Sequence, residues 1–378
     1  MKRTNKFLLC AIPLLIFSLS GCGAQQTKQA NNSFASMYHN RAEAFYCYKT
    51  VNNLTHTLDY ETMKDAALCN KPNCKHTATD CFMKRLNGLV PVFDGERAYY
   101  FKDDAPSYQP DDSGKTKVVL GSWLYVYDFL HGTETKLFHV DASVSNNCYG
   151  LLLKDNSIYF IENLYSRDTD GNGVETGFGN TGGPMSLHVY SLETQEETKL
   201  CELYDPNEIG NVYPLVHYSG EVYMAGVYDN KLYFNVSFIS ETQPALVPKS
   251  YPTYYDFADG TYHGQPDNIS DFESSFVTFA SEDYLVECRT GEAAVYRKGN
   301  AIPVELTNEC FNDFSYIYVS NNTLFCAGKA FDLNTEEVRE PAVLKDKSVV
   351  AKYGDSYIIS DIGMRENFEK IPAEQLLK

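Results

Sequence analysis

One short pattern of polar and apolar positions recurs along most of the chain. A turn rich in Asp, Asn and Gly precedes a short aromatic or aliphatic run, as where Asp155-Asn156 precedes Ile158-Tyr159-Phe160. Turn residues beside aromatic and β-branched residues are typical of a hairpin and its second strand. The pattern predicts seven such strands: Phe45–Tyr48, Ala98–Phe101, Ile158–Phe160, Leu232–Phe234, Tyr284–Val286, Leu324–Phe325 and Tyr357–Ile359.

A second strand pair follows several of these runs. In one example Leu187–Tyr190 is followed by the polar turn Ser191–Thr194 and then by Lys199-Leu200-Cys201. Units of two strand pairs that recur at roughly 30 to 75 residues are typical of propeller blades with loops of varying length. Helical periodicity is nearly absent, and 29 Tyr and 22 Phe favour half-buried strands.

These patterns predict an all-β fold, a β-propeller over residues 37–378 with six to eight blades, seven being favoured. One four-stranded blade cannot bury both of its faces, so blades pack side by side in a ring that also protects their edges. We expect either Phe34–Asn40 or Phe368–Leu377 to supply the strand that closes the ring. A pair of β-sandwiches is the competing all-β interpretation.

The N-terminal segment has a different character. Lys2, Arg3 and Lys6 precede the apolar run Phe7–Phe17, which is too short for a bilayer span of roughly 20 residues but has the length of a signal peptide. The sequence Leu19-Ser20-Gly21-Cys22 that follows resembles the lipobox of bacterial lipoprotein precursors.

This resemblance implies that residues 1–21 are a signal peptide and that Cys22 becomes a diacylglyceryl-modified, palmitate-type anchor. Two acyl chains meet the requirement for stable anchoring to a membrane. The polar residues 22–36 are then expected to form a lipidated tether, because they cannot bury enough surface to fold. The predicted location is the extracytoplasmic face of a cell membrane, without crossing it.

Charge narrows the range of partners. The formal net charge is −18, and cleavage of the signal peptide would remove Lys2, Arg3 and Lys6, which makes the mature chain more negative still. An acidic surface disfavours nucleic acid and anionic headgroups, whereas cationic ligands, metals or basic protein patches fit it better.

Cysteine and histidine gather in the segment 69–81. Cys69, Cys74, His76 and Cys81 have the ligand types of a structural Cys₃His zinc site, although their spacing is not that of a common zinc finger. A disulfide is the alternative, because thiols of exported proteins often pair. Setting aside Cys10 and Cys22 leaves an odd number of cysteines, which cannot all pair, and free thiols remain a third interpretation. The segment lies between the first two predicted blades, where a cross-link would stabilise an insertion loop.

The same segment carries a resemblance to a family. Leu68-Cys69, Lys71-Pro72, Cys74-Lys75-His76 and Cys81 resemble an insertion after an early blade in propeller lipoproteins of Gram-positive gut bacteria. The resemblance implies a propeller fold and a membrane location, and it brings no known reaction with it.

A second candidate for metal binding lies in the sequence that starts at Asp168. Asp168, Asp170 and Asn172 alternate like the first ligands of a calcium loop, with Gly173 at the sixth position. The twelfth position, where such loops carry a bidentate Glu, is Gly179. Calcium and a solvated inter-strand loop are both compatible with this pattern.

The function hypotheses follow from the lipobox-like sequence, the tether, the blade repeats and the absence of a catalytic motif in the sequence. The leading one is a lipid-anchored binding or scaffolding module for a protein or glycan ligand. The alternative is a glycan hydrolase or lyase whose carboxylates lie on propeller loops. A third hypothesis is that the propeller senses or supports the assembly of envelope complexes.

Overall fold

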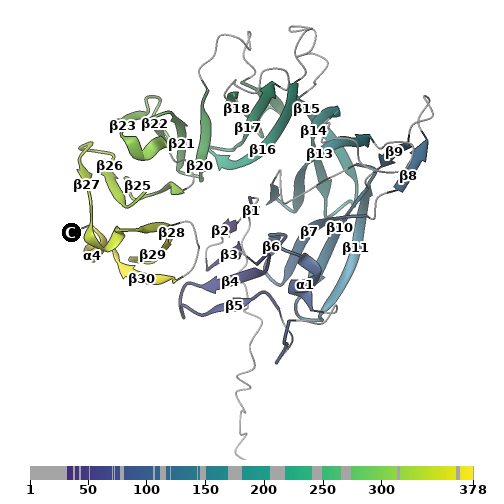
Figure 1. Ribbon diagram of the computed structural model, residues 1–378, viewed down its shortest axis with the longest axis horizontal. Coiled ribbons are helices and arrows are strands. Elements are labelled where there is room, and N and C mark those ends of the chain that lie inside the picture. The colour runs from purple at the N-terminus through teal and green to yellow at the C-terminus, as the bar shows by residue number, and fades with distance from the viewer. Residues whose placement is uncertain are drawn as a thin grey trace, which may run out of the picture.

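A computed structural model provides the fold. The structure describes residues 32–36, 39–41, 44–50, 52–69, 71, 73–76, 81–104, 107–110, 116–119, 121–142, 144, 150–168, 181–204, 218–240, 249–264, 274–312, 316–362 and 367–377. Within them, seven antiparallel strand groups follow one another around a common centre, and we number them as blades in chain order (Figure 1). The predicted β-propeller is confirmed, with seven blades among the described residues.

The first three blades have four strands each. Blade 1 contains β2 (His39–Arg41), β3 (Phe45–Lys49), β4 (Thr55–Asp59) and β5 (Asp65–Ala67). Blade 2 contains β6 (Val92–Asp94), β7 (Arg97–Asp103), β10 (Ser122–Asp128) and β11 (Thr133–Val140). Blade 3 contains β12 (Leu151–Lys154), β13 (Ser157–Asp168), β14 (Thr181–Ser191) and β15 (Glu197–Tyr204).

Blades 4 to 6 also have four strands, and blade 7 has three in the described part of the chain. Blade 4 contains β16 (Tyr218–Tyr228), β17 (Lys231–Ser240), β18 (Lys249–Asp256) and β19 (Thr261–His263). Blade 5 contains β20 (Phe276–Ala280), β21 (Tyr284–Arg289), β22 (Glu292–Arg297) and β23 (Val304–Thr307). Blade 6 contains β24 (Tyr318–Ser320), β25 (Thr323–Cys326), β26 (Lys329–Asp332) and β27 (Val338–Arg339), and blade 7 contains β28 (Lys347–Tyr353), β29 (Ser356–Asp361) and β30 (Glu369–Pro372).

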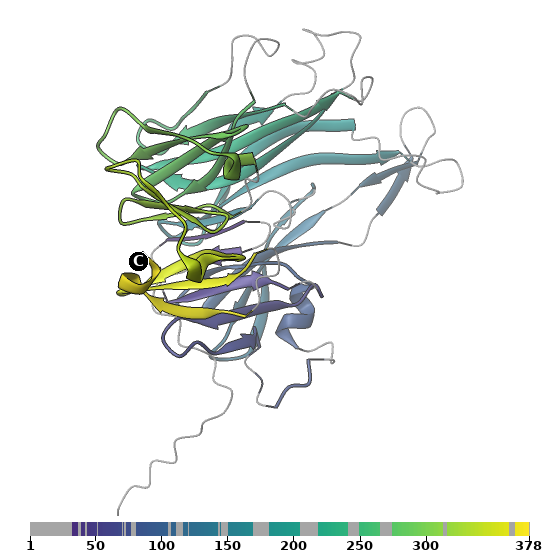
Figure 2. The same ribbon diagram turned by 60° about the vertical axis from the view of Figure 1, so that its left-hand side comes forward.

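The remaining elements are short. They are β1 (Asn32–Ala35), the hairpin β8 (Ser107–Pro110) and β9 (Thr116–Val119), α1 (Phe82–Leu86), η1 (Glu309–Asn312), η3 (Ala342–Leu344) and α4 (Ala373–Leu376). The β8–β9 hairpin pairs with the end of β13 and projects away from the ring in both views (Figures 1 and 2). None of the described helices is long and apolar enough to cross a membrane.

The predicted turns connect the two inner strands of the blades. In blades 3, 4 and 6 both turn residues have positive φ: Asp155 and Asn156, Asp229 and Asn230, and Asn321 and Asn322. A two-residue hairpin loop with both residues at positive φ matches the right-handed twist of the flanking strands. Asn and Asp tolerate that conformation better than other side chains, which explains why they recur at these positions.

The core consists of clusters that lie between neighbouring blades. Blades 3 and 4 share a cluster around Leu187 and Phe234, and blades 5 and 6 share one around Val295 and Phe331. Between blades 4 and 5, the side-chain amide of Asn235 also donates to Val277 O at 2.9 Å and accepts from Val277 N–H at 2.8 Å. Each blade therefore buries its faces against its neighbours, as a radial arrangement requires.

The ring closes by side-chain packing rather than by an exchanged strand. Tyr46, Tyr48 and Tyr60 of blade 1 pack against Val350 and Ile358 of blade 7 in one buried cluster. The segment Phe368–Leu377 supplies β30 to the last blade, whereas Phe34–Asn40 belongs to β1 and β2 at the centre. The expectation that one of these segments closes the ring as a strand was therefore wrong for the described residues.

Strand β1 lies at the centre of the ring, between the inner strands β12 and β2 (Figure 1). Its bounds overlap the predicted tether 22–36, so Asn32–Ala35 at the end of that segment form a strand instead of tether. Ser33 explains the difference: its hydroxyl is buried, accepts from Asn40 Nδ2 at 2.8 Å and accepts from Phe93 N–H at 3.1 Å. These contacts fix a polar segment in the interior.

Asn40 allows a test of this central anchor. Its side chain is fully buried and also donates to Pro91 O at 2.9 Å. Asn40→Leu leaves Ser33 and Pro91 without that donor and is expected to lower the free energy of unfolding by about 1–3 kcal/mol in urea titrations. The control Asn52→Leu, at an exposed turn position, is expected to change it by less than about 0.5 kcal/mol. Equal effects of the two substitutions would contradict the anchor.

Candidate functional site

The predicted insertion lies between β5 and β6, and the side chains of its three cysteines and its histidine point toward one another. The three thiol sulfurs of Cys69, Cys74 and Cys81 and a ring nitrogen of His76 all lie within 4.8 Å of one another. Cys81 Sγ is 3.6 Å from Cys69 Sγ, and His76 Nδ1 is 3.4 Å from Cys81 Sγ. The four residues therefore form one group that could hold a metal ion.

Two of the separations are close to the edges of a tetrahedral site. With Zn–S bonds of about 2.3 Å and Zn–N bonds of about 2.0 Å, tetrahedral geometry places neighbouring ligand atoms about 3.5–3.8 Å apart. The described S···S and N···S separations of 3.6 and 3.4 Å lie close to this range.

Local backbone conformation turns the ligands toward one another. Asn73 and His76 both have positive φ, 55° and 56°, and the His76 N–H donates to Cys74 Sγ at 3.4 Å. Cys81, which is fully buried, directly precedes α1, whose residues Phe82 and Leu86 lie in the core between blades 1 and 2. The group thus fastens an otherwise irregular loop to the core.

The thiols differ in acidity. Burial raises the pKa of Cys69 to about 12, and the neighbouring sulfurs of Cys81 and Cys74 contribute in the same direction. The pKa of Cys74 is lowered, chiefly by the backbone N–H of His76. A bound cation would favour the thiolate form of all three.

The described cysteines are free thiols, and the 3.6 Å between Cys69 and Cys81 exceeds the disulfide bond length of about 2.05 Å. The disulfide alternative remains a prediction. Other predicted site residues are less informative, since Asp168 is the last residue of β13, while Asp170, Asn172 and Cys22 lie outside the described residues.

A pocket of about 680 Å³ lies at the centre of the ring. The inner strands of six blades line it, together with β1, so it is built by segments far apart in the sequence. Its walls combine apolar residues such as Phe34 and Phe279 with polar ones such as Asn235 and Thr278. A volume of about 300–1,000 Å³ is typical of small-molecule sites, although the lining of this pocket is more polar than is usual for them.

Arg41 on β2 is a charged residue of this pocket that sequence analysis did not single out. Its Nε–H donates to Val350 O of blade 7 at 3.0 Å. The guanidinium carbon lies 5.7 Å from the ring centres of both Phe279 and Tyr318. Hydrogen bonding and two aromatic neighbours therefore position a side chain that is still exposed to solvent.

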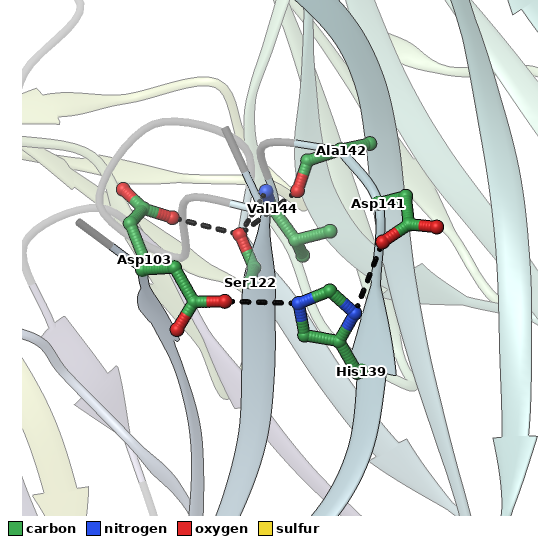
Figure 3. Close-up of polar contacts among 7 residues, drawn as sticks. Asp103, Ser122, His139, Asp141, Ala142 and Val144 are labelled. Atoms are coloured by element: carbon green, nitrogen blue, oxygen red, sulfur yellow. Dashed lines mark hydrogen bonds and ion pairs between the residues drawn. The ribbon is translucent and has the colours of Figure 1, made fainter. Parts of the chain in front are cut away.

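Two further polar clusters lie within blades 2 and 3, away from the residues that line the central pocket. In blade 2, Ser122 Oγ lies 2.8 Å from Asp103 Oδ1 and 3.0 Å from Ala142 O and accepts from Val144 N–H (Figure 3). His139 lies between Asp104 at 2.9 Å and Asp141 at 3.2 Å. Gly121 leaves room for this ring, because a Cβ there would lie 2.7 Å from His139 Nε2.

In blade 3, His188 is buried between Glu162 at 3.0 Å and Glu197. Burial disfavours its protonated ring, but hydrogen bonds to the two carboxylates outweigh this effect and raise the pKa of His188. Each histidine thus contacts carboxylates of its own blade.

Comparisons with known proteins add little about activity. No protein-family model matches the chain, and no curated protein matches it in sequence. The chain is similar to the β-propeller domain of the trilobed protease from Pyrococcus furiosus, described as having an open velcro topology. Identity is 8%, coverage is 91% of this chain and 94% of that one, and the TM-score is 0.38.

Two other similar structures are those of a peptidase and a lyase. Dipeptidyl peptidase 4 from Porphyromonas gingivalis is 10% identical, with 91% of this chain and 53% of that chain covered and a TM-score of 0.39. Oligogalacturonate lyase from Vibrio parahaemolyticus is 8% identical, with 89% and 95% covered and a TM-score of 0.33. At these values nothing about activity transfers, and the propeller fold of this chain rests on its own strand order.

Proposed function

We propose that the protein is a lipid-anchored, extracytoplasmic binding module that takes a small ligand, or one unit of a larger one, in the central pocket. The pocket carries this proposal, because six blades contribute inner strands to a single cavity with a mixed apolar and polar lining. The lipobox-like sequence before Cys22 supports the anchor, and the polar residues after it support a short tether.

We further propose that Cys69, Cys74, His76 and Cys81 hold a structural zinc ion. The Cys₃His donor set and the separations of its atoms support zinc, which prefers four nitrogen and sulfur ligands. Four protein ligands would fill a tetrahedral site, so this zinc would stabilise the loop between blades 1 and 2 rather than act on a substrate.

The pocket can be tested with a variant that narrows it. Ala225 lies on β16 and lines the pocket, and Ala225→Phe adds a ring to its wall. The control Ala66→Phe makes the same change on β5, the outer strand of blade 1. Thermal unfolding is measured with a panel of sugars, oligosaccharides, amino acids and organic acids. We expect at least one compound to stabilise the wild type and Ala66→Phe but not Ala225→Phe.

The glycan hydrolase or lyase alternative stays a prediction, and the same panel tests it. Product formation from an oligosaccharide by the wild-type protein would establish the enzymatic function. Stabilisation without turnover would favour binding.

A further inference from the structure

The charge of the central pocket differs from that of the chain as a whole. The chain carries a formal net charge of −18, yet Arg41 and Lys352 both line the pocket. Of the acidic residues there, Glu282 forms an ion pair with Lys298, and Asp283 is its neighbour on the turn between β20 and β21. The described lining thus holds two cations and two acidic residues, one of them already paired, and is less negative than the chain as a whole. An anion meets less repulsion here than over most of the surface.

The guanidinium of Arg41 is held in place by one hydrogen bond, and its other donors are left for a ligand. Its Nε–H is bound to Val350 O, which fixes the direction of the group. Among the described residues, no hydrogen bond or ion pair engages Nη1 or Nη2 of this exposed side chain. The two Nη atoms of an Arg present parallel donors whose spacing matches the two oxygens of a carboxylate.

A second, independent feature lies beside it. Tyr60 lines the same pocket and is 1% exposed, and its hydroxyl has no partner among the described residues. Buried polar groups are nearly always hydrogen-bonded, so a hydroxyl without a partner indicates a missing one. Tyr60 and Arg41 both line this pocket, and the positive charge of Arg41 opposes the effect of burial, which raises the pKa of Tyr60.

The walls suit a carbon skeleton next to such an anion. Phe279 and Tyr318 contact each other edge to face, with ring centres 5.5 Å apart, and each ring centre lies 5.7 Å from the guanidinium carbon. Phe34 and Ile317 extend this apolar wall. A ring or short chain could contact these side chains while its charged end meets the Arg41 donors.

We propose that the central pocket binds an organic carboxylate, whose oxygens accept hydrogen bonds from Nη1 and Nη2 of Arg41 while its carbon skeleton packs against the apolar wall that includes Phe279 and Tyr318. This inference rests on the proposed binding function and specifies its ligand class. An aromatic acid and an acidic sugar share the required chemistry.

The test compares matched pairs of probes by titration calorimetry. Benzoate against benzamide represents an aromatic acid, and glucuronate against glucose represents an acidic sugar. We expect at least one carboxylate to bind the wild-type protein about ten-fold more tightly than its neutral partner. The pair that shows the preference identifies the source of the carboxylate.

Variants assign this preference to Arg41. Arg41→Gln is expected to abolish it, and Arg41→Lys to retain part of it, because Lys keeps the charge without the paired donors. The control Arg97→Gln removes an exposed Arg that pairs with Asp94 on blade 2, and it is expected to bind like the wild type.

A measurement on the wild-type chain covers the case in which Arg41→Gln does not fold. Phenylglyoxal modifies accessible guanidinium groups, and peptide mapping reports the rate at Arg41. The preferred carboxylate is expected to slow modification of Arg41 and not of Arg97, whereas its neutral partner slows neither.

Three results would overturn the inference: equal affinity for acid and neutral partner in both pairs, a preference that survives in Arg41→Gln, or no protection of Arg41. The Ala225→Phe comparison separates this failure from that of the binding function. If neutral compounds stabilise the wild type and Ala66→Phe but not Ala225→Phe, the proposal that the pocket binds a ligand stands. Only the proposal that this ligand is a carboxylate is then rejected.

Discussion

Replacing His76 by Ala is expected to remove one bound zinc ion and to lower the free energy of unfolding by about 2–5 kcal/mol, the range for loss of a structural cross-link. The effect is large because Cys81 leads directly into α1, whose Phe82 and Leu86 are fully buried. Phe82 stacks on Tyr127 of blade 2 with ring centres 3.9 Å apart. Release of the loop would therefore loosen the contact between the first two blades.

Zinc is measured as the difference between the native and the denatured mass of protein purified without chelator. The control is His131→Ala, which removes an exposed His paired with Asp128 on a blade 2 turn and should leave the zinc in place. A mass deficit of two hydrogens that persists on denaturation, with no metal, would instead establish a disulfide. One zinc that remains bound in His76→Ala would remove His76 from the ligand set.

Replacing Cys22 by Ser is expected to transfer the protein from the membrane fraction to the soluble fraction and to abolish incorporation of labelled palmitate. Each methylene buried in the bilayer contributes about 0.8 kcal/mol, so the loss of two acyl chains removes the whole anchoring energy. Cell fractionation and palmitate labelling measure the two effects.

The matched control for this change is Cys10→Ser, which makes the same substitution inside the predicted signal peptide. It is expected to leave both location and labelling unchanged. Palmitate incorporation that persists in Cys22→Ser, or protein that stays with the membranes after the signal peptide is cleaved, would contradict the anchor.

Local chemistry explains why much of the fold could be predicted from the sequence. The turns at Asp155-Asn156 and Asn321-Asn322 need two residues at positive φ, and Asx side chains followed by alternating apolar residues reveal both the turn and its strand. The same reasoning found the Cys₃His group, because its four ligands lie within one short segment and their residue types are those of zinc.

What was missed depends on contacts between distant segments. Ring closure rests on Tyr48 of blade 1 packing near Ile358 of blade 7, and neither residue carries a local sign of that contact. Ser33 resembles a tether residue until Asn40 and Phe93 engage its hydroxyl.

Arg41 is the clearest case of such a dependence. It is a single cation on a three-residue strand, and its role depends on Val350, Phe279 and Tyr318, which are more than 200 positions away in the sequence. The sequence contains only an indirect indication of the role of Arg41. In an acidic chain, an Arg within a strand at the start of the first predicted blade is a candidate for the inner wall.

The central claim is that the ligand binds in the pocket at the centre of the ring, and thermal unfolding of the wild type, Ala225→Phe and Ala66→Phe across one compound panel tests it most directly. We predict that a stabilising compound raises the unfolding temperature of the wild type and of Ala66→Phe equally and leaves that of Ala225→Phe unchanged. Equal stabilisation of all three proteins, or stabilisation of none by any compound, would contradict the claim.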